Sequence, residues 1–330
     1  MQNLSEKWRE LEKGLNAVIL GKEALVKDVV IGLLAGGHVL LEGLPGLGKT
    51  MMVRALSSLC SLDTRRIQFT PDLMPLDITG SYILTEEGGE RKFTFHQGPV
   101  FGNLILADEI NRASPKTQSA LLEAMQERRV TVIGKTHELP SPFWVMATQN
   151  PIELEGTYPL PEAQLDRFMM KLLVDDVPAE VLERLLLERG RGDLPEMQPV
   201  LGREEIARAM KDVEALPLSK PIASYIARLV MATHPSEGGA AAKPIKFGAS
   251  PRAALAMGMA GRARAYLDGR ETVGFEDVKA VAAQTLRHRI ILDYAARLDG
   301  VTSDAVIAGI LESVDELERK APAIIAEKEA

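Results

Sequence analysis

The segment Gly43-Leu44-Pro45-Gly46-Leu47-Gly48-Lys49-Thr50 decides how the rest of the chain is interpreted, because it matches the phosphate-loop pattern GxxxxGK[ST] at every specified position. Glycines let backbone N–H groups turn toward phosphate oxygens, and the start of a following helix attracts the same anion. The apolar strand pattern HVLLE (38–42) precedes the loop, and MMVRALSSL (51–59) can continue as a helix. Lys49 is therefore expected to reach the β- and γ-phosphates, and Thr50 to hold Mg²⁺.

Two carboxylates, Asp108 and Glu109, end a second apolar strand pattern, NLILA (103–107). Ligands of open parallel sheets bind at the carboxyl ends of the strands, which is where this pair is expected. Asp108 suits the magnesium shell, and Glu109 suits a base that orients or deprotonates the attacking water. An acidic pair after a strand can also be a helix N-terminal charge, and Ser114-Pro115 does indicate a helix start. The phosphate loop ~60 residues upstream favours the functional interpretation.

Three further polar residues are weaker candidates. Asn150 follows the strand pattern FWVMA (143–147) and could bind the γ-phosphate or the water held by Glu109, although Asn before Pro is also a common turn residue. Arg167 and Arg252 each lie near an expected helix end. The planar guanidinium fork suits charge spread over a transferring phosphoryl group, but a single helical Arg is usually a solvated surface residue.

The organisation of the 330 residues predicts two domains, at ~150 residues each. Strand patterns alternate with helical stretches up to about residue 174, which predicts a mostly parallel sheet with helices on its faces. The overlong interval 69–96 predicts inserted turns and a hairpin, and 129–140 predicts a second hairpin with Gly134-Lys135 at its turn. Helical patterns dominate afterwards. We therefore expect an α/β domain over 1–176, opened by a helix, and an all-α domain over 177–330.

The composition argues against several classes of protein. The formal net charge is −7, which argues against nucleic-acid binding through bulk charge. Cys60 is the single cysteine, which indicates a reducing compartment, and the five histidines are too scattered for a metal site. The N-terminus does not have a signal-peptide pattern, and no apolar stretch is long enough for a bilayer. A cytoplasmic protein without membrane insertion is the expectation.

Together these motifs resemble the AAA+ ATPases and, more narrowly, the MoxR family. The resemblance is carried by GLPGLGKT (43–50), by FHQGPVFGNLILADEINRASPKTQSALLEAMQERRVT (95–131), by ATQNP (147–151) and by PEAQLDRF (161–168). It implies an αβα nucleotide-binding domain and a helical lid. It also implies an insert in the second helix region and a hairpin before the sensor-1 strand, which fit the two hairpin regions above.

The resemblance assigns roles to individual residues. Residues 43–50 match the Walker A motif, with Met51 next to it in the nucleotide site, and Asp108-Glu109 match Walker B. Asn150 matches sensor 1, Arg167 the arginine finger that points into a neighbouring subunit's nucleotide, and Arg252 sensor 2, whose action on its own or a neighbouring nucleotide differs among relatives. ATP and Mg²⁺ are the implied ligands.

The resemblance also implies partners. These are further copies in a ring, usually hexameric, and protein clients, often with a von Willebrand factor A domain and sometimes in metal-cofactor insertion. The sequence does not contain the aromatic-apolar-glycine pore loop of threading unfoldases, so local remodelling is expected. Two alternatives share these motifs. One is a nucleic-acid motor of the minichromosome-maintenance type, which Lys135 at a hairpin tip favours, and the other is the ATPase subunit of magnesium chelatase.

Overall fold

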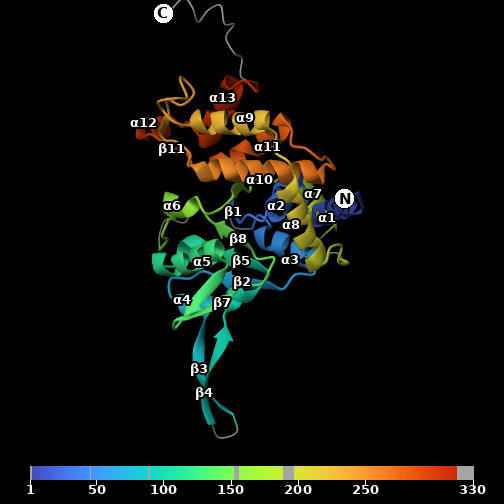
Figure 1. The fold of residues 1–330 in the computed structure, drawn as a ribbon, viewed down its shortest axis with the longest axis vertical. Coiled ribbons are helices and arrows are strands. Elements are labelled where there is room, and N and C mark those ends of the chain that lie inside the picture. The colour runs from blue at the N-terminus through green and yellow to red at the C-terminus, as the bar shows by residue number, and fades with distance from the viewer. Residues whose placement is uncertain (1, 45, 88–89, 152–155, 189–196, 318–330) are drawn as a thin grey trace, which may run out of the picture. The chain divides into compact units, whose positions relative to one another are not determined.

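The computed structural model describes residues 2–44, 46–87, 90–151, 156–188 and 197–317. They form two compact units, which are considered separately. Unit 1 comprises residues up to Ala215 together with Tyr266–Gly269, and unit 2 comprises Leu216–Ala265 and the residues from Arg270 onward. Figure 1 labels helices and strands of both units where there is room.

A five-stranded parallel sheet forms the centre of unit 1, with strand order β2-β5-β8-β1-β9. All five strands lie where apolar runs predicted them: β1 (Val39–Glu42), β2 (Thr64–Gln68), β5 (Leu104–Asp108), β8 (Trp144–Gln149) and β9 (Met170–Leu173). Because neighbouring strands are parallel, their carboxyl ends share one edge of the sheet. The segments after β1, β5 and β8 therefore meet at that edge.

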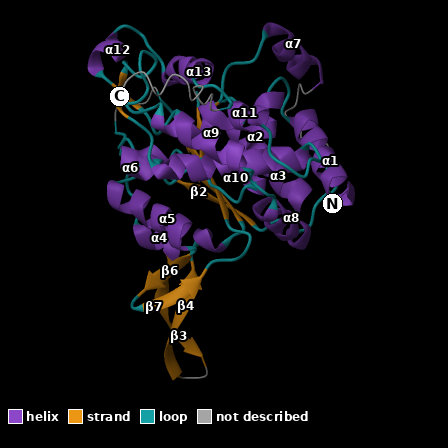
Figure 2. Ribbon diagram, turned by 45° about the horizontal axis from the view of Figure 1, so that its top comes forward, coloured by secondary structure: helices purple, strands orange, loops and turns teal. Residues whose placement is uncertain are grey.

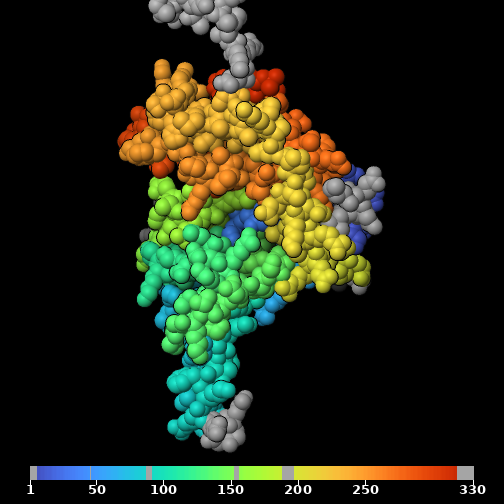
Figure 3. All heavy atoms as spheres, viewed as in Figure 1, coloured from blue at the N-terminus to red at the C-terminus, as the bar shows by residue number. Residues whose placement is uncertain are grey.

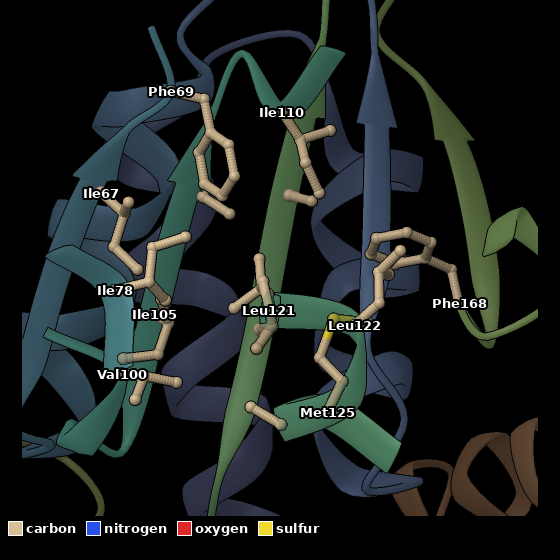
Figure 4. Close-up of a cluster of buried hydrophobic side chains, with 14 of the residues drawn as sticks. Ile67, Phe69, Ile78, Val100, Ile105, Ile110, Leu121, Leu122, Met125 and Phe168 are labelled. Carbon is tan, nitrogen blue, oxygen red and sulfur yellow. The ribbon is translucent and has the colours of Figure 1, made fainter. Parts of the chain in front are cut away.

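Helices cover both faces of this sheet. Helix α5 (Pro115–Glu127) contributes Leu121, Leu122 and Met125 to a buried cluster that also holds Ile105 of the sheet (Figure 4). On the opposite face lie α2 (Glu23–Leu34), where Gly32 contacts Val39, and α3 (Lys49–Cys60). Helix α1 (Gln2–Val18) packs on α2 and α3 through a buried stripe that its sequence spacing predicted, Trp8, Leu11, Leu15 and Val18.

Two antiparallel hairpins interrupt the alternation of strands and helices. The first, β3 (Gly80–Glu87) with β4 (Glu90–Gln97), follows α4 (Pro75–Thr79) and extends away from the body of unit 1 (Figures 1 and 3). The second pairs β6 (Arg129–Val132) with β7 (Lys135–Glu138), and Figure 2 shows it beside the first. Its turn is Ile133-Gly134, both with positive φ, so Lys135 is the first residue of β7 rather than a turn residue.

The remaining elements of unit 1 are short 3₁₀ turns and helices that flank the sheet. These are η1 (Pro99–Phe101), η2 (Ile110–Arg112), α6 (Glu162–Leu165), α7 (Ala179–Glu188) and α8 (Arg203–Ala215). Helix α8 packs on α2, and Lys7 of α1 forms an ion pair with Glu205 at 2.6 Å. Residues 197–215, which the sequence assignment placed in the lid, therefore belong to unit 1 by packing, because α8 buries Ile206 and Val213 there.

Unit 2 is helical apart from one short sheet. Its helices are α9 (Lys220–Met231), α10 (Pro251–Leu267, whose last residues group with unit 1), α11 (Phe275–Leu286), α12 (Tyr294–Leu298) and α13 (Ser303–Ser313). Strands β10 (Ile245–Phe247) and β11 (Ile291–Leu292) pair antiparallel, within segments too short to show a sequence period. Among the residues that the structure describes, no helix is both long and apolar enough to span a membrane.

Candidate functional site

The phosphate loop follows β1 and ends at the first turn of α3, as its sequence predicts. Gly46 and Gly48 have φ of +84° and +87°, and open space surrounds the position that a Cβ would occupy on either residue. That left-handed conformation suits glycine, and the open space leaves the backbone accessible to a ligand. The first N–H groups of α3 belong to a helix end that attracts anions. Pro45 lies outside the described residues.

Lys49 reaches across the loop. Its ammonium donates to the Gly43 carbonyl at 2.7 Å and to the Gln149 carbonyl at 3.4 Å. Thr50 and Met51 follow it in the first turn of α3 and are half-buried. The loop thus carries a cation beside an open backbone cradle, which is an arrangement suited to a polyphosphate.

Asp108 is the last residue of β5, and its side chain is buried beside β8. Its carboxylate accepts a hydrogen bond from the Thr148 hydroxyl at 2.7 Å and pairs with the Arg66 guanidinium at 2.7 Å. Thr148 in turn accepts the N–H of Glu109 at 2.9 Å. Within the segment TQN (148–150), the first residue, Thr148, therefore fixes the acidic pair, whereas the sequence analysis selected the last residue, Asn150.

Glu109 adopts a left-handed backbone, with φ +57° and ψ +50°. This conformation is sparsely populated for a residue with a side chain and recurs at functional sites. One carboxylate oxygen of Glu109 accepts hydrogen bonds from Gln68 and from Arg112, each at 2.9 Å. The candidate base is thus held by two donors, neither of which the sequence analysis singled out.

Asn150 lies at the same edge of the sheet, directly after β8, and is buried. Its carbonyl accepts a hydrogen bond from Asn111 at 3.4 Å. Residues Lys49, Thr50, Asp108, Glu109 and Asn150 therefore follow the carboxyl ends of three strands, β1, β5 and β8, which are neighbours in the sheet. The sequence separated these residues by up to ~100 positions, and the parallel topology brings them together.

Arg167 lies at the other edge of the sheet. It precedes the amino end of β9, where Met169 donates its N–H to the His38 carbonyl at 2.8 Å. Its side chain lines a polar cavity of about 610 Å³ between α5, α6 and the β6–β7 hairpin, together with Glu123, Glu127 and Arg129. Four strand residues separate this edge from the phosphate loop, a span of about 13 Å. Arg167 is therefore not grouped with the other candidates in its own chain.

Arg252 belongs to unit 2. It is the second residue of α10, where it is exposed, and it thus lies near a helix end as expected from the sequence.

Gln68 and Lys22 are among the residues that contact the site and that the sequence analysis missed. Gln68 ends β2, the strand next to β5, so its proximity to Glu109 could have been derived from the expected strand order. Lys22 precedes α2 and donates to the Leu47 carbonyl of the phosphate loop at 3.2 Å. Nothing in its local sequence marks it, because its partner lies 25 residues away.

Comparisons with known proteins agree with this geometry. Residues 38–170 match the family model described as "ATPase family associated with various cellular activities (AAA)", and residues 239–310 match an AAA lid domain. The protein named chaperone MoxR1 of Mycobacterium tuberculosis is 44% identical over 90% of this chain and 79% of its own length. Protein MoxR of Paracoccus denitrificans is 33% identical over 88% of this chain and 90% of its own. A solved structure described as a putative ATPase of Cytophaga hutchinsonii has a TM-score of 0.88 at 40% identity, covering 95% and 96% of the two chains.

Proposed function

Because the chain belongs to the MoxR family of AAA+ ATPases, we propose that it hydrolyses ATP with Mg²⁺ at the carboxyl edge of its sheet and uses that reaction to remodel partner proteins. The observation that carries the proposal is the placement of Lys49, Asp108, Glu109 and Asn150 at one edge, behind an open phosphate loop. That set provides a cradle, a cation, a metal-binding carboxylate and a base, which phosphoryl transfer requires.

The donor set fits a magnesium nucleotide. Asp108 and Thr50 supply the oxygen ligands that Mg²⁺ prefers, and residues 43–51 hold the phosphates. When bound, Mg²⁺ neutralises charge on the β- and γ-phosphate oxygens. Lys49 exchanges its two carbonyl contacts for phosphate oxygens, and Asn150 orients the γ-phosphate or the attacking water. Glu109 accepts the proton of that water once Gln68 and Arg112 let its carboxylate turn.

Arg167 completes the site of a neighbouring copy. Its place at the amino edge supports this role, because a side chain there cannot span the sheet to its own phosphate loop. An arginine supplied by a neighbour typically raises the rate by ~10³–10⁵. The active form is then a ring, proposed as a hexamer, and Arg252 of the lid contributes to a nucleotide site of its own or of a neighbouring copy.

Mixing two inactive variants tests this proposal. Arg167→Ala and Glu109→Gln are each expected to lose most turnover while still binding ATP, because each keeps its phosphate loop. In an equal mixture, about one quarter of the contacts join an intact Glu109 to an intact neighbouring Arg167, so about a quarter of wild-type activity should return. Phosphate release per chain, measured across a wide range of protein concentration, should also rise and then saturate for the wild type.

The matched control is an equal mixture of Arg167→Ala with the double variant Arg167→Ala,Glu109→Gln, which cannot restore any contact because neither protein supplies Arg167. An inactive mixture of the two variants, after subunit exchange has been verified by size and fluorescence, would show that Arg167 does not act between copies. A wild type that neither binds nor hydrolyses ATP would remove the proposed function itself.

The clients are proposed from the family relationship. The relatives named chaperone MoxR1 and MoxR favour protein clients, and we include proteins with a von Willebrand factor A domain and factors of metal-cofactor insertion among them. The work is proposed to take place in the cytoplasm. The nucleic-acid alternative is less favoured, because the ammonium of Lys135, next to the turn of the second hairpin, lies 5.2 Å from the centre of the Tyr82 ring.

A further inference from the structure

Lys22 connects three segments of unit 1 that meet beside the phosphate loop. It precedes α2, and its ammonium donates to the Leu47 carbonyl at 3.2 Å and to the Asp175 carbonyl at 2.8 Å. Leu47 belongs to the phosphate loop, and Asp175 follows β9. Lys22 therefore holds the loop to the rest of unit 1 through hydrogen bonds to main-chain carbonyls.

The backbone from which the Lys22 side chain projects is itself fixed. Gly21 has a φ of +72°, and a Cβ at that position would lie 2.7 Å from a methyl group of Val181 in α7. The backbone at residue 21 is thus both left-handed and in close contact, which suits glycine alone. On the other side, the Lys22 carbonyl accepts the Val26 N–H at 2.9 Å in the first turn of α2. The ammonium consequently projects from a well-defined backbone position.

The contact with Leu47 has a consequence for the next residue. In a planar trans peptide, the carbonyl of one residue and the N–H of the following residue point in opposite directions. The Leu47 carbonyl points toward Lys22, so the N–H of Gly48 points in the opposite direction within the peptide plane, away from Lys22. Because Gly48 tolerates either sign of φ, rotation of this peptide meets little steric resistance. One charge-assisted hydrogen bond is then what selects between the two orientations.

We propose that Lys22 is a positioning residue for the phosphate loop: by holding the Leu47 carbonyl, it keeps the Gly48 N–H turned toward the bound phosphate. This inference rests on the proposed nucleotide site. Lys22 acts through the peptide and does not touch the nucleotide. Its environment is partly desolvated, since burial lowers the pKa of Lys22 from its ordinary value, while Asp175 and Asp176 raise it and Lys49 lowers it.

The test compares binding of a fluorescent ATP analogue with Mg²⁺ by four full-length proteins: wild type, Lys22→Met, Lys22→Gln and Lys27→Met. Lys22→Met keeps the apolar stem and removes every donor, so its Kd should rise about tenfold, as for the loss of one hydrogen bond from a charged group. Lys22→Gln keeps an N–H donor without charge and should bind within about threefold of the wild type. Lys27→Met is the control, because Lys27 lies in α2, the helix that Lys22 precedes, in a surface ion pair with Asp268 at 3.3 Å.

Melting without nucleotide, followed by the fluorescence of Trp8 and Trp144, verifies that all four proteins are folded at the temperature of the binding experiment. Equal Kd values for Lys22→Met and wild type would overturn the inference and leave the proposed function standing. Equally weak binding by Lys22→Met and Lys22→Gln would overturn it too, because the charge would then act on the phosphates directly. Equally weak binding by Lys27→Met would reduce the effect to a general property of α2. A wild type that does not bind the analogue would remove both proposals.

Discussion

At the scale of single residues, the site keeps its candidate base, Glu109, restrained. The carboxylate of Glu109 accepts hydrogen bonds from Gln68 and Arg112 at one oxygen, and its backbone is left-handed. A residue held in this way is positioned before the substrate arrives, with two of the roughly four lone-pair sites of its carboxylate, both on one oxygen, occupied. For the carboxylate to turn, at least one of these two donors must release it.

Replacing Gln68 by Ala should loosen this restraint. The lost hydrogen bond from Gln68 is worth about 1 kcal/mol, so Glu109 turns more readily toward the water. Basal turnover should therefore be about fivefold higher. Initial rates of phosphate release at saturating ATP measure the change, and Gln68→Ala combined with Glu109→Gln should remain inactive. A decrease in basal turnover instead would mean that Gln68 holds Glu109 in its reactive orientation.

His38 makes the stability of unit 1 depend on pH. Its Nε2 donates to the Met125 carbonyl at 3.1 Å and its Nδ1 accepts the Val145 N–H at 3.0 Å, so the folded ring is neutral. Burial lowers the pKa of His38 to about 4; the bond to Met125 opposes this shift and Arg128 adds to it. The unfolded chain binds the extra proton near pH 6.5. Stability is thus complete above that pH and is lost as the pH falls toward 4.

At pH 5 this residue alone should cost about 2 kcal/mol of the free energy of unfolding relative to pH 7.5. Urea unfolding followed by tryptophan fluorescence reports this value for unit 1, because Trp8 and Trp144 are the protein's two tryptophans and both lie there. His38→Gln should flatten the pH dependence, whereas His96→Gln, at an exposed position, should not. An unchanged slope in His38→Gln would assign the pH dependence to other groups.

At the scale of elements, the two hairpins of unit 1 are joined by a small aromatic contact. The ring of His137 in β7 stacks on Phe95 of β4 with centroids 3.9 Å apart, and its Nε2 lies 3.3 Å from the Tyr82 hydroxyl of β3. The β3–β4 hairpin is long and otherwise exposed, with Phe93 69% accessible. An isolated two-stranded hairpin is marginally stable in water, so this contact at its base orders it.

His137→Ala should therefore loosen β3–β4 without unfolding the sheet. The lost aromatic contact is worth about 1 kcal/mol, which corresponds to local opening about fivefold more frequent. Hydrogen exchange of peptides covering residues 80–86 and 91–97 measures it. The control is Thr131→Ala, an exposed position on the same small hairpin that pairs with Thr136. Identical exchange in the two variants would contradict the role given to His137.

At the scale of the whole molecule, the sequence predicted the elements better than their packing. The five sheet strands and the phosphate loop were found because apolar runs and the glycine pattern are local signals. Residues 203–215 were placed with the lid because a helical pattern does not show what a helix packs against, and α8 packs on α2. The strands β10 and β11 were missed because two or three residues do not form a period.

In the candidate site, too, the sequence predicted the residues that a local motif marks and missed those that only the packing of distant segments brings in. Lys49, Asp108 and Glu109 lie in motifs whose spacing along the chain reflects the chemistry. Lys22 could not be found, because its partners lie 25 and 153 residues away and it acts on their carbonyls, which any residue possesses. The turn of the second hairpin was displaced by one residue, since Ile133 adopts a positive φ that a β-branched residue rarely takes.

The parallel sheet also gives unit 1 a polarity. Its carboxyl edge carries Lys49 and Asp108, and its amino edge carries Arg167. Under the proposed function, copies that join one edge to the other make a heterologous contact that repeats in the same sense. An open row of such copies, whatever its length, has at one end a nucleotide site that no neighbouring Arg167 completes. At its other end it has an Arg167 that completes no site. Only an assembly without ends has every site complete.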